Sequence, residues 1–404
     1  MPAPCPMTPW SFTCRPPKKS RQRPRGGTPS SGGYTPDLPG AGKCRRPRRS
    51  HKEKEMDRGQ LGGLSRLPSL DAEQRLGFAL SLRTMITAGG VSAKSRAAGS
   101  AALKEEGIQS DDVEAICRVM DRIPDTQIRN RMLRSLQEMT WDSAFSAVDG
   151  DRERLERELH ADSDDSLLEL APDLEMPDYI QFDFHLQPGG YVGDALAGEV
   201  YHHGTNAFYM GFNAGDMVHN GLVACGQAPL SGGVERALDM ATGIGQCATA
   251  LKQRYPDAEV WGLDPSEPLL RYAHKRARGM GLPVRFKQAR GEATGFDDDH
   301  FDVINSYILF HEIPFSATEK VVHEIYRILR PGGVFNIYDF PVGDPMSPES
   351  RYMFEMDHRD NGEPWSIDLM ENDFDGVLTS AGFEITPGPR QFLVVKTWHC
   401  HKPL

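Results

Sequence analysis

The sequence has no long uninterrupted run of apolar residues. No stretch of it approaches the roughly 18 to 20 apolar residues with which a helix crosses a bilayer. The first residues also lack the apolar core of a secretory signal peptide. We therefore expect no membrane span, no secretion and a cytoplasmic location.

Paired cysteine motifs are also missing. The seven cysteines are scattered without a CxxC pair: Cys5, Cys14, Cys44, Cys117, Cys225, Cys247 and Cys400. An odd number of widely spaced cysteines is typical of free thiols in a reducing compartment, and not of zinc or redox chemistry. Two adjacent histidines, His202 and His203, seldom chelate one ion, and His185 stands apart from them. The sequence therefore predicts no metal site.

The charge is divided unevenly along the chain. Residues 1–58 hold 14 Lys and Arg against 4 Asp and Glu, whereas the remaining residues hold 32 against 53. The first segment is also rich in Pro, Gly and Ser, and we predict that it is a disordered basic tail. The tail is interpreted as a solvated extension, with Met56 as an alternative start; nucleic-acid attachment is the other interpretation. The acidic remainder makes nucleic acid an unfavoured substrate.

Residues 59–178 are predicted to form a helical region that ends in an acidic linker. Apolar residues recur at helical spacing, as in the set Phe78, Leu82, Met85 and Ile86 and the set Val113, Ile116, Cys117, Met120 and Ile123. Such stripes indicate a core or the seam of a homodimer. Residues 179–233 differ in composition, with many Gly, His and aromatic residues. This composition predicts a pocket wall or lid, and a surface connector is the alternative.

From residue 234 to 404 short apolar runs alternate with helical patterns. The runs RALDMA, AEVWGLD, VRFKQA, FDVINSY and VFNIYDF are predicted strands, with helices between them. This alternation predicts an α/β fold, a Rossmann-like doubly wound and mostly parallel sheet. The C-terminal FEITPGPRQFLVVKTWHC suits a hairpin, which would add an antiparallel edge.

A glycine-containing turn follows the first of these strands. Asp239 ends the strand, Gly243 and Gly245 form the turn, and a predicted helix opens directly after it. Such a turn lets a ligand approach the backbone, and Asp264, at the end of the second strand, stands where an acidic side chain binds ribose hydroxyls. A nicotinamide dinucleotide needs a third glycine at the position of Ala248. Because Asp239 would repel a pyrophosphate and attract an ammonium group, the turn favours S-adenosylmethionine.

The segment from Arg236 to Pro341 resembles the class I S-adenosylmethionine-dependent methyltransferases. It is similar to the small-molecule group that includes the ubiquinone and menaquinone biosynthesis enzymes. The resemblance rests on LDMATGIG, GLDPSEPLLRYAHKRA, RGEATGFDDDHFD and FDVINSYILFHEIPFSATEKVVHEIYRILRPGG, which follow in the family's order and spacing. It covers about a quarter of the chain and implies S-adenosyl-L-methionine as the cofactor.

The resemblance also implies which residues bind this cofactor. Asp239, Gly243 and Gly245 would hold the methionine part and Asp264 the ribose, while Pro265 and Ser266 would line the adenosine pocket. Ser306 and Tyr307 would face the sulfonium. Ala241 replaces a usual glycine, and Arg290 replaces a usual Asp or Asn before Gly291 and Glu292, so that adenine recognition would fall to backbone groups.

Methyl transfer to an acidic hydroxyl needs a base in addition to alignment of the reactants. His311 is the candidate base, with Glu312 as a carboxylate that would orient it, and a role in capping or packing is the alternative. Asp339, at the end of the fifth strand, is the third catalytic candidate. The insert that follows carries Asp357, His358 and Glu363 and could complete an apolar pocket.

The sequence therefore predicts an enzyme that methylates a small, lipophilic or aromatic molecule. O-methylation is the first expectation, and C-methylation of a quinone or isoprenoid-type acceptor is the alternative. A catalytically silent cofactor-binding partner module and an RNA methyltransferase guided by the basic tail are the rival functions.

Overall fold

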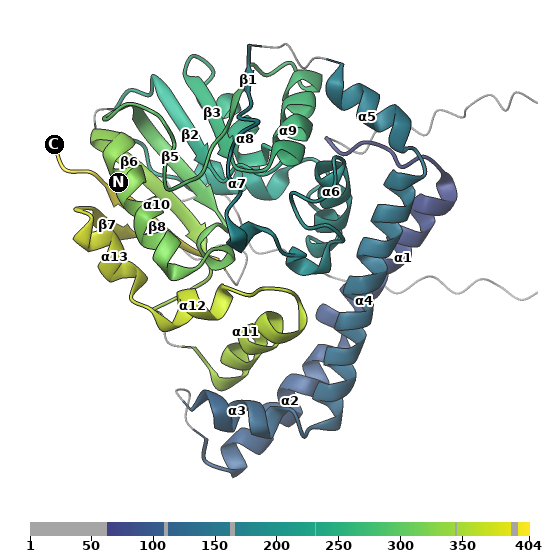
Figure 1. The fold of residues 1–404 in the computed structure, drawn as a ribbon. Coiled ribbons are helices and arrows are strands. Elements are labelled where there is room, and N and C mark those ends of the chain that lie inside the picture. The colour runs from purple at the N-terminus through teal and green to yellow at the C-terminus, as the bar shows by residue number, and fades with distance from the viewer. Residues whose placement is uncertain (1–62, 109–111, 162–165, 231, 344–345, 389–394) are drawn as a thin grey trace, which may run out of the picture. The chain divides into compact units, whose positions relative to one another are not determined.

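The computed structural model describes residues 63–404, apart from residues 109–111, 162–165, 231, 344–345 and 389–394 (Figure 1). The chain divides into two units, Met1–Arg58 and Gly59–Leu404. The predicted tail is the first unit and lies outside the described residues.

The described residues form one sheet of eight strands, in the order β1-β4-β3-β2-β5-β6-β8-β7. The strands are β1 (Leu168–Glu169), β2 (Arg236–Met240), β3 (Glu259–Asp264), β4 (Arg285–Gln288), β5 (Phe301–Tyr307), β6 (Leu329–Asp339), β7 (Glu384–Pro387) and β8 (Lys396–His401). All neighbours from β1 to β6 are parallel, and β8 is antiparallel to both β6 and β7. The doubly wound sheet with an antiparallel C-terminal edge is confirmed.

One strand of the sheet comes from the segment assigned to the acidic linker. Leu168 in β1 pairs with Phe286 in β4, and the backbone N–H of Phe286 donates to the carbonyl of Leu167. A strand of two residues carries too few side chains to show a period of two. The sheet therefore begins before the Gly/His/aromatic segment.

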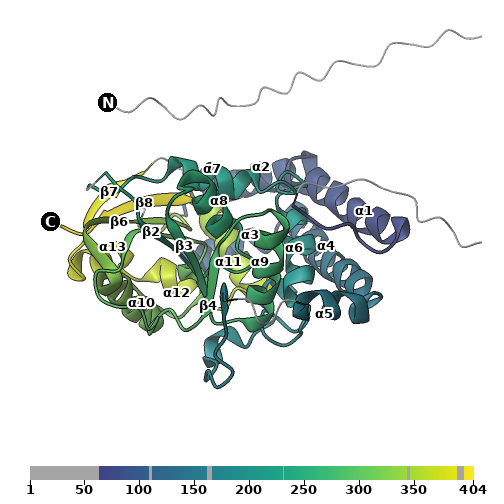
Figure 2. The same cartoon turned by 90° about the horizontal axis from the view of Figure 1, so that it is seen from above.

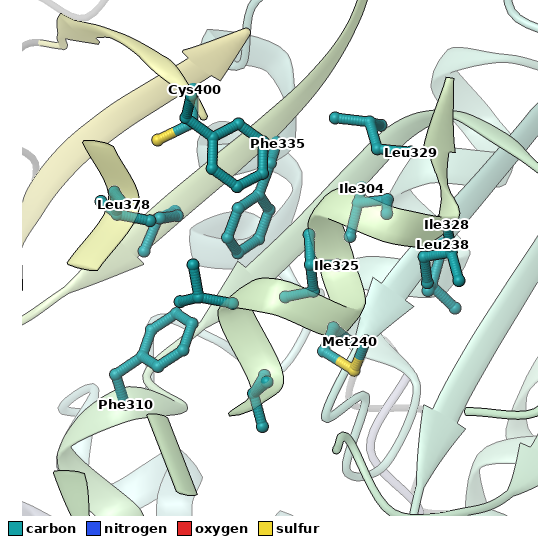
Figure 3. Packing of buried hydrophobic residues seen from close by; sticks show 14 of the residues in the cluster. Leu238, Met240, Ile304, Phe310, Ile325, Ile328, Leu329, Phe335, Leu378 and Cys400 are labelled. Carbon is teal, nitrogen blue, oxygen red and sulfur yellow. The ribbon is translucent and has the colours of Figure 1, made fainter. Parts of the chain in front are cut away.

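Helices cover both faces of the sheet (Figures 1 and 2). They include α7 (Met217–Cys225), α8 (Gln246–Arg254), α9 (Glu267–Gly279), α10 (Phe315–Ile328) and α13 (Phe374–Ser380). In α10, Val321, Ile325 and Ile328 recur at helical spacing and are fully or almost fully buried. Figure 3 shows Ile325 and Ile328 packed with Leu238, Ile304 and Phe335 of the strands.

The predicted helical region is present. It contains α1 (Leu70–Thr87), α2 (Gly90–Glu105), α3 (Val113–Met120), α4 (Pro124–Asp149) and α5 (Arg152–His160). The helix α4 packs against α1 and α2 and also against α6 (Ala197–Phe208), which comes from the Gly/His/aromatic segment. Only part of the apolar stripe of α1 is core, since Ile86 is buried while Phe78 is 60% exposed. None of the helices in the described part is both long enough and apolar enough to span a membrane.

Two segments far apart in the chain meet beside the sheet. The first holds η1 (Asp178–Ile180) and η2 (Phe184–Leu186); the second holds α11 (Pro348–Asp360) and α12 (Ser366–Glu371). Gly362 has φ +71°, and a Cβ there would lie 2.9 Å from the carbonyl oxygen of Asp183. The close approach of the two segments therefore requires glycine. The short helix η3 (Phe310–Glu312), which follows β5, packs against α12.

Candidate active site

A cavity opens at the carboxyl ends of β2, β3 and β5. It spans about 800 Å³ of space, including its open mouth. Its strand side is lined by Met240, Ala241, Gly243, Asp264 and Pro265, which lie at or just after the ends of β2 and β3. Its other side is aromatic, with Tyr179, Phe184, Tyr191, Tyr201 and Tyr307. Four of these five residues come from the Gly/His/aromatic segment, and Tyr307 ends β5.

The turn after β2 has the backbone of a ligand-binding loop. Ala241, Gly243 and Gly245 have φ values of +54°, +52° and +76°. A Cβ on Gly245 would lie 3.0 Å from Ala273 and Phe286, so helix packing requires this glycine. A Cβ on Gly243 would meet no atom within 4 Å, because that position faces the cavity. Ala241 adopts the left-handed region without being glycine, which costs about 1 to 2 kcal/mol.

Two carboxylates flank this turn. Asp239 accepts a hydrogen bond from the Thr242 hydroxyl at 2.6 Å and reaches a smaller pocket that adjoins the cavity. Asp264 accepts from the backbone N–H of Gly243 at 2.9 Å and from that of Ser266 at 2.9 Å. Burial raises the pKa of Asp239 to about 7 and the pKa of Asp264 to about 6. The two predicted acidic residues thus lie on either side of the turn, with Asp264 in the cavity wall and Asp239 in the adjoining pocket.

Not every predicted cofactor residue reaches the cavity. Ala241, Gly243, Asp264, Pro265, Gly291 and Tyr307 line it. Asp239 lines only the adjoining pocket, and four residues line neither of the two: Gly245, Ser266, Glu292 and Ser306. The Ser266 hydroxyl donates to the carbonyl of Tyr191 at 2.6 Å and also caps α9. Ser266 therefore fixes the aromatic wall to the sheet.

The carboxylate of Glu292 also holds the aromatic wall. The Tyr179 hydroxyl donates to Oε1 of Glu292 at 2.7 Å. Burial, together with this carboxylate, raises the pKa of Tyr179. Arg290 forms a single backbone bridge with Ala293 and does not line the cavity. Among these neighbours it is Gly291 that faces the cavity.

His311 forms a buried pair with Asp339 and not with Glu312. Its Nδ1 lies 2.7 Å from Oδ1 of Asp339, and its ring stacks on Phe340 at 3.9 Å between centroids. Burial opposes the charged ring, but the Asp339 carboxylate outweighs burial and raises the pKa of His311 to about 9. His311 is almost fully buried and does not line the cavity. The expectation that Glu312 orients His311 is wrong, because η3 turns the two side chains apart.

Glu312 is instead a polar group of the cavity wall. Its Oε1 accepts a hydrogen bond from the Tyr191 hydroxyl at 3.0 Å and lies 3.2 Å from Nε2 of His185. The other ring nitrogen of His185 contacts Oε1 of Glu363. Burial disfavours the charged ring of His185, but Glu363 and Glu312 raise its pKa well above the usual value.

Sequence reasoning missed the assembly of His185, Tyr191 and Glu363 around Glu312. Each residue lies in a segment predicted to border the pocket, but no motif joins positions so far apart. Of the other candidates in the insert, the His358 ring bonds the carbonyl of Glu363 at 2.8 Å and so supports that turn.

The fold and the cavity define a Rossmann-like α/β protein whose ligand site lies at the carboxyl ends of the parallel strands, on either side of a glycine turn. Residues 237–333 match the methyltransferase domain family. This match lies within the segment that resembles the class I S-adenosylmethionine-dependent methyltransferases, and it supports that resemblance.

Several known proteins are similar to this chain. The demethylmenaquinone methyltransferase of Thermus thermophilus is 43% identical over 107 residues, which cover 26% of this chain and 48% of that protein. The ubiquinone/menaquinone biosynthesis C-methyltransferase UbiE of Bordetella avium is 28% identical over 186 residues, which cover 44% of this chain and 70% of that protein. The solved structure of YcgJ from Bacillus subtilis aligns with a TM-score of 0.34 at 24% identity. The alignment covers 42% of this chain and 70% of YcgJ. The chain thus spans about half the length of the first of these relatives.

Proposed function

We propose that the protein transfers a methyl group from S-adenosyl-L-methionine to a small, apolar or aromatic molecule that carries a hydroxyl group. The observation that carries this proposal is the cavity itself. One end presents the glycine turn and Asp264, with Asp239 in the adjoining pocket, and the other presents aromatic rings and Glu312. We therefore expect the cofactor and the acceptor to bind next to each other here.

The residues at the strand ends fit the cofactor. Asp264 would accept hydrogen bonds from the ribose hydroxyls, and Asp239 would attract the ammonium group of the methionine part. The open side of Gly243 would admit the ligand next to the backbone. When bound, S-adenosylmethionine supplies a methyl group on a positively charged sulfur.

The rest of the cavity aligns the acceptor. Tyr179, Phe184, Tyr191 and Tyr201 offer flat apolar surfaces to an aromatic acceptor, and its hydroxyl would donate a hydrogen bond to Glu312. The acceptor atom attacks the methyl carbon while the carbon–sulfur bond breaks, and that electron pair stays on sulfur. The acceptor proton leaves to water. This displacement disperses charge, so alignment supplies most of the acceleration.

O-methylation is the first expected product, because a hydroxyl oxygen held at Glu312 is itself a nucleophile. C-methylation is the second candidate, and the names of the T. thermophilus and B. avium relatives support it. Both reactions start from a hydroxyl-bearing acceptor. Within this proposal His311 and Asp339 act by positioning: their pair fixes η3 and hence the adjacent Glu312.

The experiment is to incubate the full-length chain with cell extract and S-adenosylmethionine labelled with ¹³C in its methyl group. We expect one labelled small molecule, whose ¹³C shift separates an O-methyl from a C-methyl carbon. The Asp264→Asn variant is the control for cofactor-dependent labelling. If the wild type binds the cofactor but labels nothing beyond this control, the chain is a silent cofactor-binding module.

The helix α1 presents an exposed apolar side that could join two copies of the chain. Leu70, Phe78 and Met85 on α1 are each more than half exposed, at 55%, 60% and 52%. Their spacing places them along one side of the helix. A homodimer through this side of α1 is the partner that we propose, and light scattering of Phe78→Ser against the wild type tests it.

A further inference from the structure

We propose that His185, Glu312 and Glu363 form a site for one divalent transition-metal ion at the acceptor end of the cavity. The three residues come from η2, from η3 and from the turn before α12, three segments that are distant in the chain. One ring nitrogen and one oxygen from each carboxylate all lie within 4.8 Å of one another. The sequence predicted no metal, because no two of these residues share a motif.

The donor atoms lie close together. Straight hydrogen bonds from the two nitrogens of one imidazole diverge and would hold two carboxylates on opposite sides of the ring. Here the two carboxylates converge instead, with Oε1 of Glu312 3.2 Å from Nε2 and Oε1 of Glu363 in contact with Nδ1. Such convergence is the arrangement that an ion stabilises.

An unpaired carboxylate oxygen is the second observation. The Glu363 side chain is only 1% exposed, and its Oε2 has no hydrogen-bond partner among the described residues. A buried charged oxygen without a partner is costly unless a ligand satisfies it. Two carboxylates against one imidazole also leave a net negative charge, even when the ring is protonated. A cation would satisfy both the oxygen and the charge.

The backbone holds His185 in place for such a role. His185 has φ +53°, an uncommon conformation for a residue other than glycine. Its carbonyl accepts hydrogen bonds from Nε2 of Gln137 at 2.8 Å and from Nε1 of Trp141 at 2.5 Å. Two side chains of α4 therefore fix His185 in this strained conformation. The hydrogen bond that the Tyr191 hydroxyl donates to Glu312 likewise fixes the orientation of Glu312.

The mixed donor set selects the ion. One imidazole and two carboxylates suit Mn²⁺, Fe²⁺, Co²⁺ or Zn²⁺ better than Mg²⁺, which prefers oxygen ligands alone. Three protein ligands leave coordination positions open, and Glu312 places the site on the cavity wall. The role of the ion rests on the proposed function: it would bind the oxygen of the acceptor and promote loss of the hydroxyl proton to water.

The test uses the full-length chain, stripped with a chelator and titrated with Co²⁺ in equilibrium dialysis, with visible absorption as a second readout. We expect one site per chain that Mg²⁺ does not displace. Glu363→Gln and His185→Gln should each weaken it at least tenfold. Glu371→Gln and His323→Gln are matched controls, because Glu371 is 62% exposed, His323 is exposed, and both lie outside the cluster.

Equal Co²⁺ affinity in Glu363→Gln and Glu371→Gln would overturn the proposal, as would the absence of a site in the wild type. Ions held by cysteines or by histidines other than His185 are retained in both Glu363→Gln and Glu371→Gln, so they cannot produce a difference between these two variants. Circular dichroism and cofactor binding show whether each variant folds, and Glu312→Gln replaces any variant that does not. Cofactor titration without metal tests the proposed function separately, so the two failures are distinguishable.

Discussion

The backbone N–H of Gly243 donates a hydrogen bond to Oδ2 of Asp264 across 2.9 Å. This bond joins the glycine turn after β2 to the carboxylate at the end of β3. Because Asp264 also accepts from Ser266, it fixes the start of α9 at the same time. One carboxylate thereby sets the shape of the cofactor end of the cavity.

Replacing Asp264 with Asn should weaken S-adenosylmethionine binding by about 10- to 100-fold. The amide keeps the volume but loses the charge, and hydrogen bonds to charged groups contribute about 1.5 to 3 kcal/mol. Its NH₂ group would also face a backbone N–H. Isothermal titration measures the change, and the exposed Asp257→Asn is the matched control. Equal affinities for the two variants would remove Asp264 from the site.

Cofactor affinity should rise with pH. The pKa values of Asp239 and Asp264 are raised by burial to about 7 and about 6, so both side chains are mostly protonated at about pH 5 and ionised at about pH 8. The contacts proposed for them need the ionised forms. Titrations at these two pH values should show tighter binding at the higher one, and Asp264→Asn should show a smaller difference. A flat profile would contradict the assignment.

The raised pKa values of Asp239 and Asp264 also make the stability of the ligand-free protein depend on pH, but in the opposite direction to cofactor affinity. An acid whose pKa is raised by folding stabilises the fold at low pH, and this contribution is lost as pH rises to the folded pKa. Ligand-free stability from these two residues should therefore fall between about pH 4 and about pH 7. The stabilisation gained by adding cofactor should grow over the same interval.

Asp339→Ala should be strongly destabilising. Asp339 is fully buried and accepts hydrogen bonds from the backbone N–H groups of Phe310 and Phe340 as well as from His311. Removing one partner of such a buried pair typically costs about 3 to 5 kcal/mol. Urea unfolding gives the value, with the exposed Asp297→Ala as the control. A change as small as that of the control would show that the pair does not hold η3.

Deleting Met1–Glu55 should leave cofactor affinity unchanged, because the deleted residues belong to the first unit and the cavity lies in the second. The acidic charge of the remaining chain predicts no salt-sensitive RNA binding for the truncated protein. Filter binding at two salt concentrations checks this. RNA binding that is lost on deletion, together with loss of methylation, would favour the RNA methyltransferase instead.

The sheet and the cofactor end could be predicted because their signals are local. The five predicted parallel strands are short runs that contain apolar residues. Asp239 and Gly243 lie at and just after the end of β2, and Asp264 ends β3. The carboxyl ends of neighbouring parallel strands meet at one edge of a sheet. The place of these residues at one edge of a parallel sheet therefore follows from the alternation of strands and helices.

The acceptor end could not be predicted in the same way. His185 and Glu363 reach Glu312 only because Gly362 lets two loops approach closely, and no sequence period encodes such a contact. The direction of the Glu312 side chain depends on η3. Glu312 faces the cavity there, while His311, the preceding residue, is buried. Tertiary packing decides this end of the site.

Isothermal titration of the full-length chain with S-adenosylmethionine tests the central claim most directly. The account predicts one site per chain, competition by S-adenosylhomocysteine and weaker binding by Asp264→Asn. The absence of binding by the folded wild-type protein at pH 8 would contradict it.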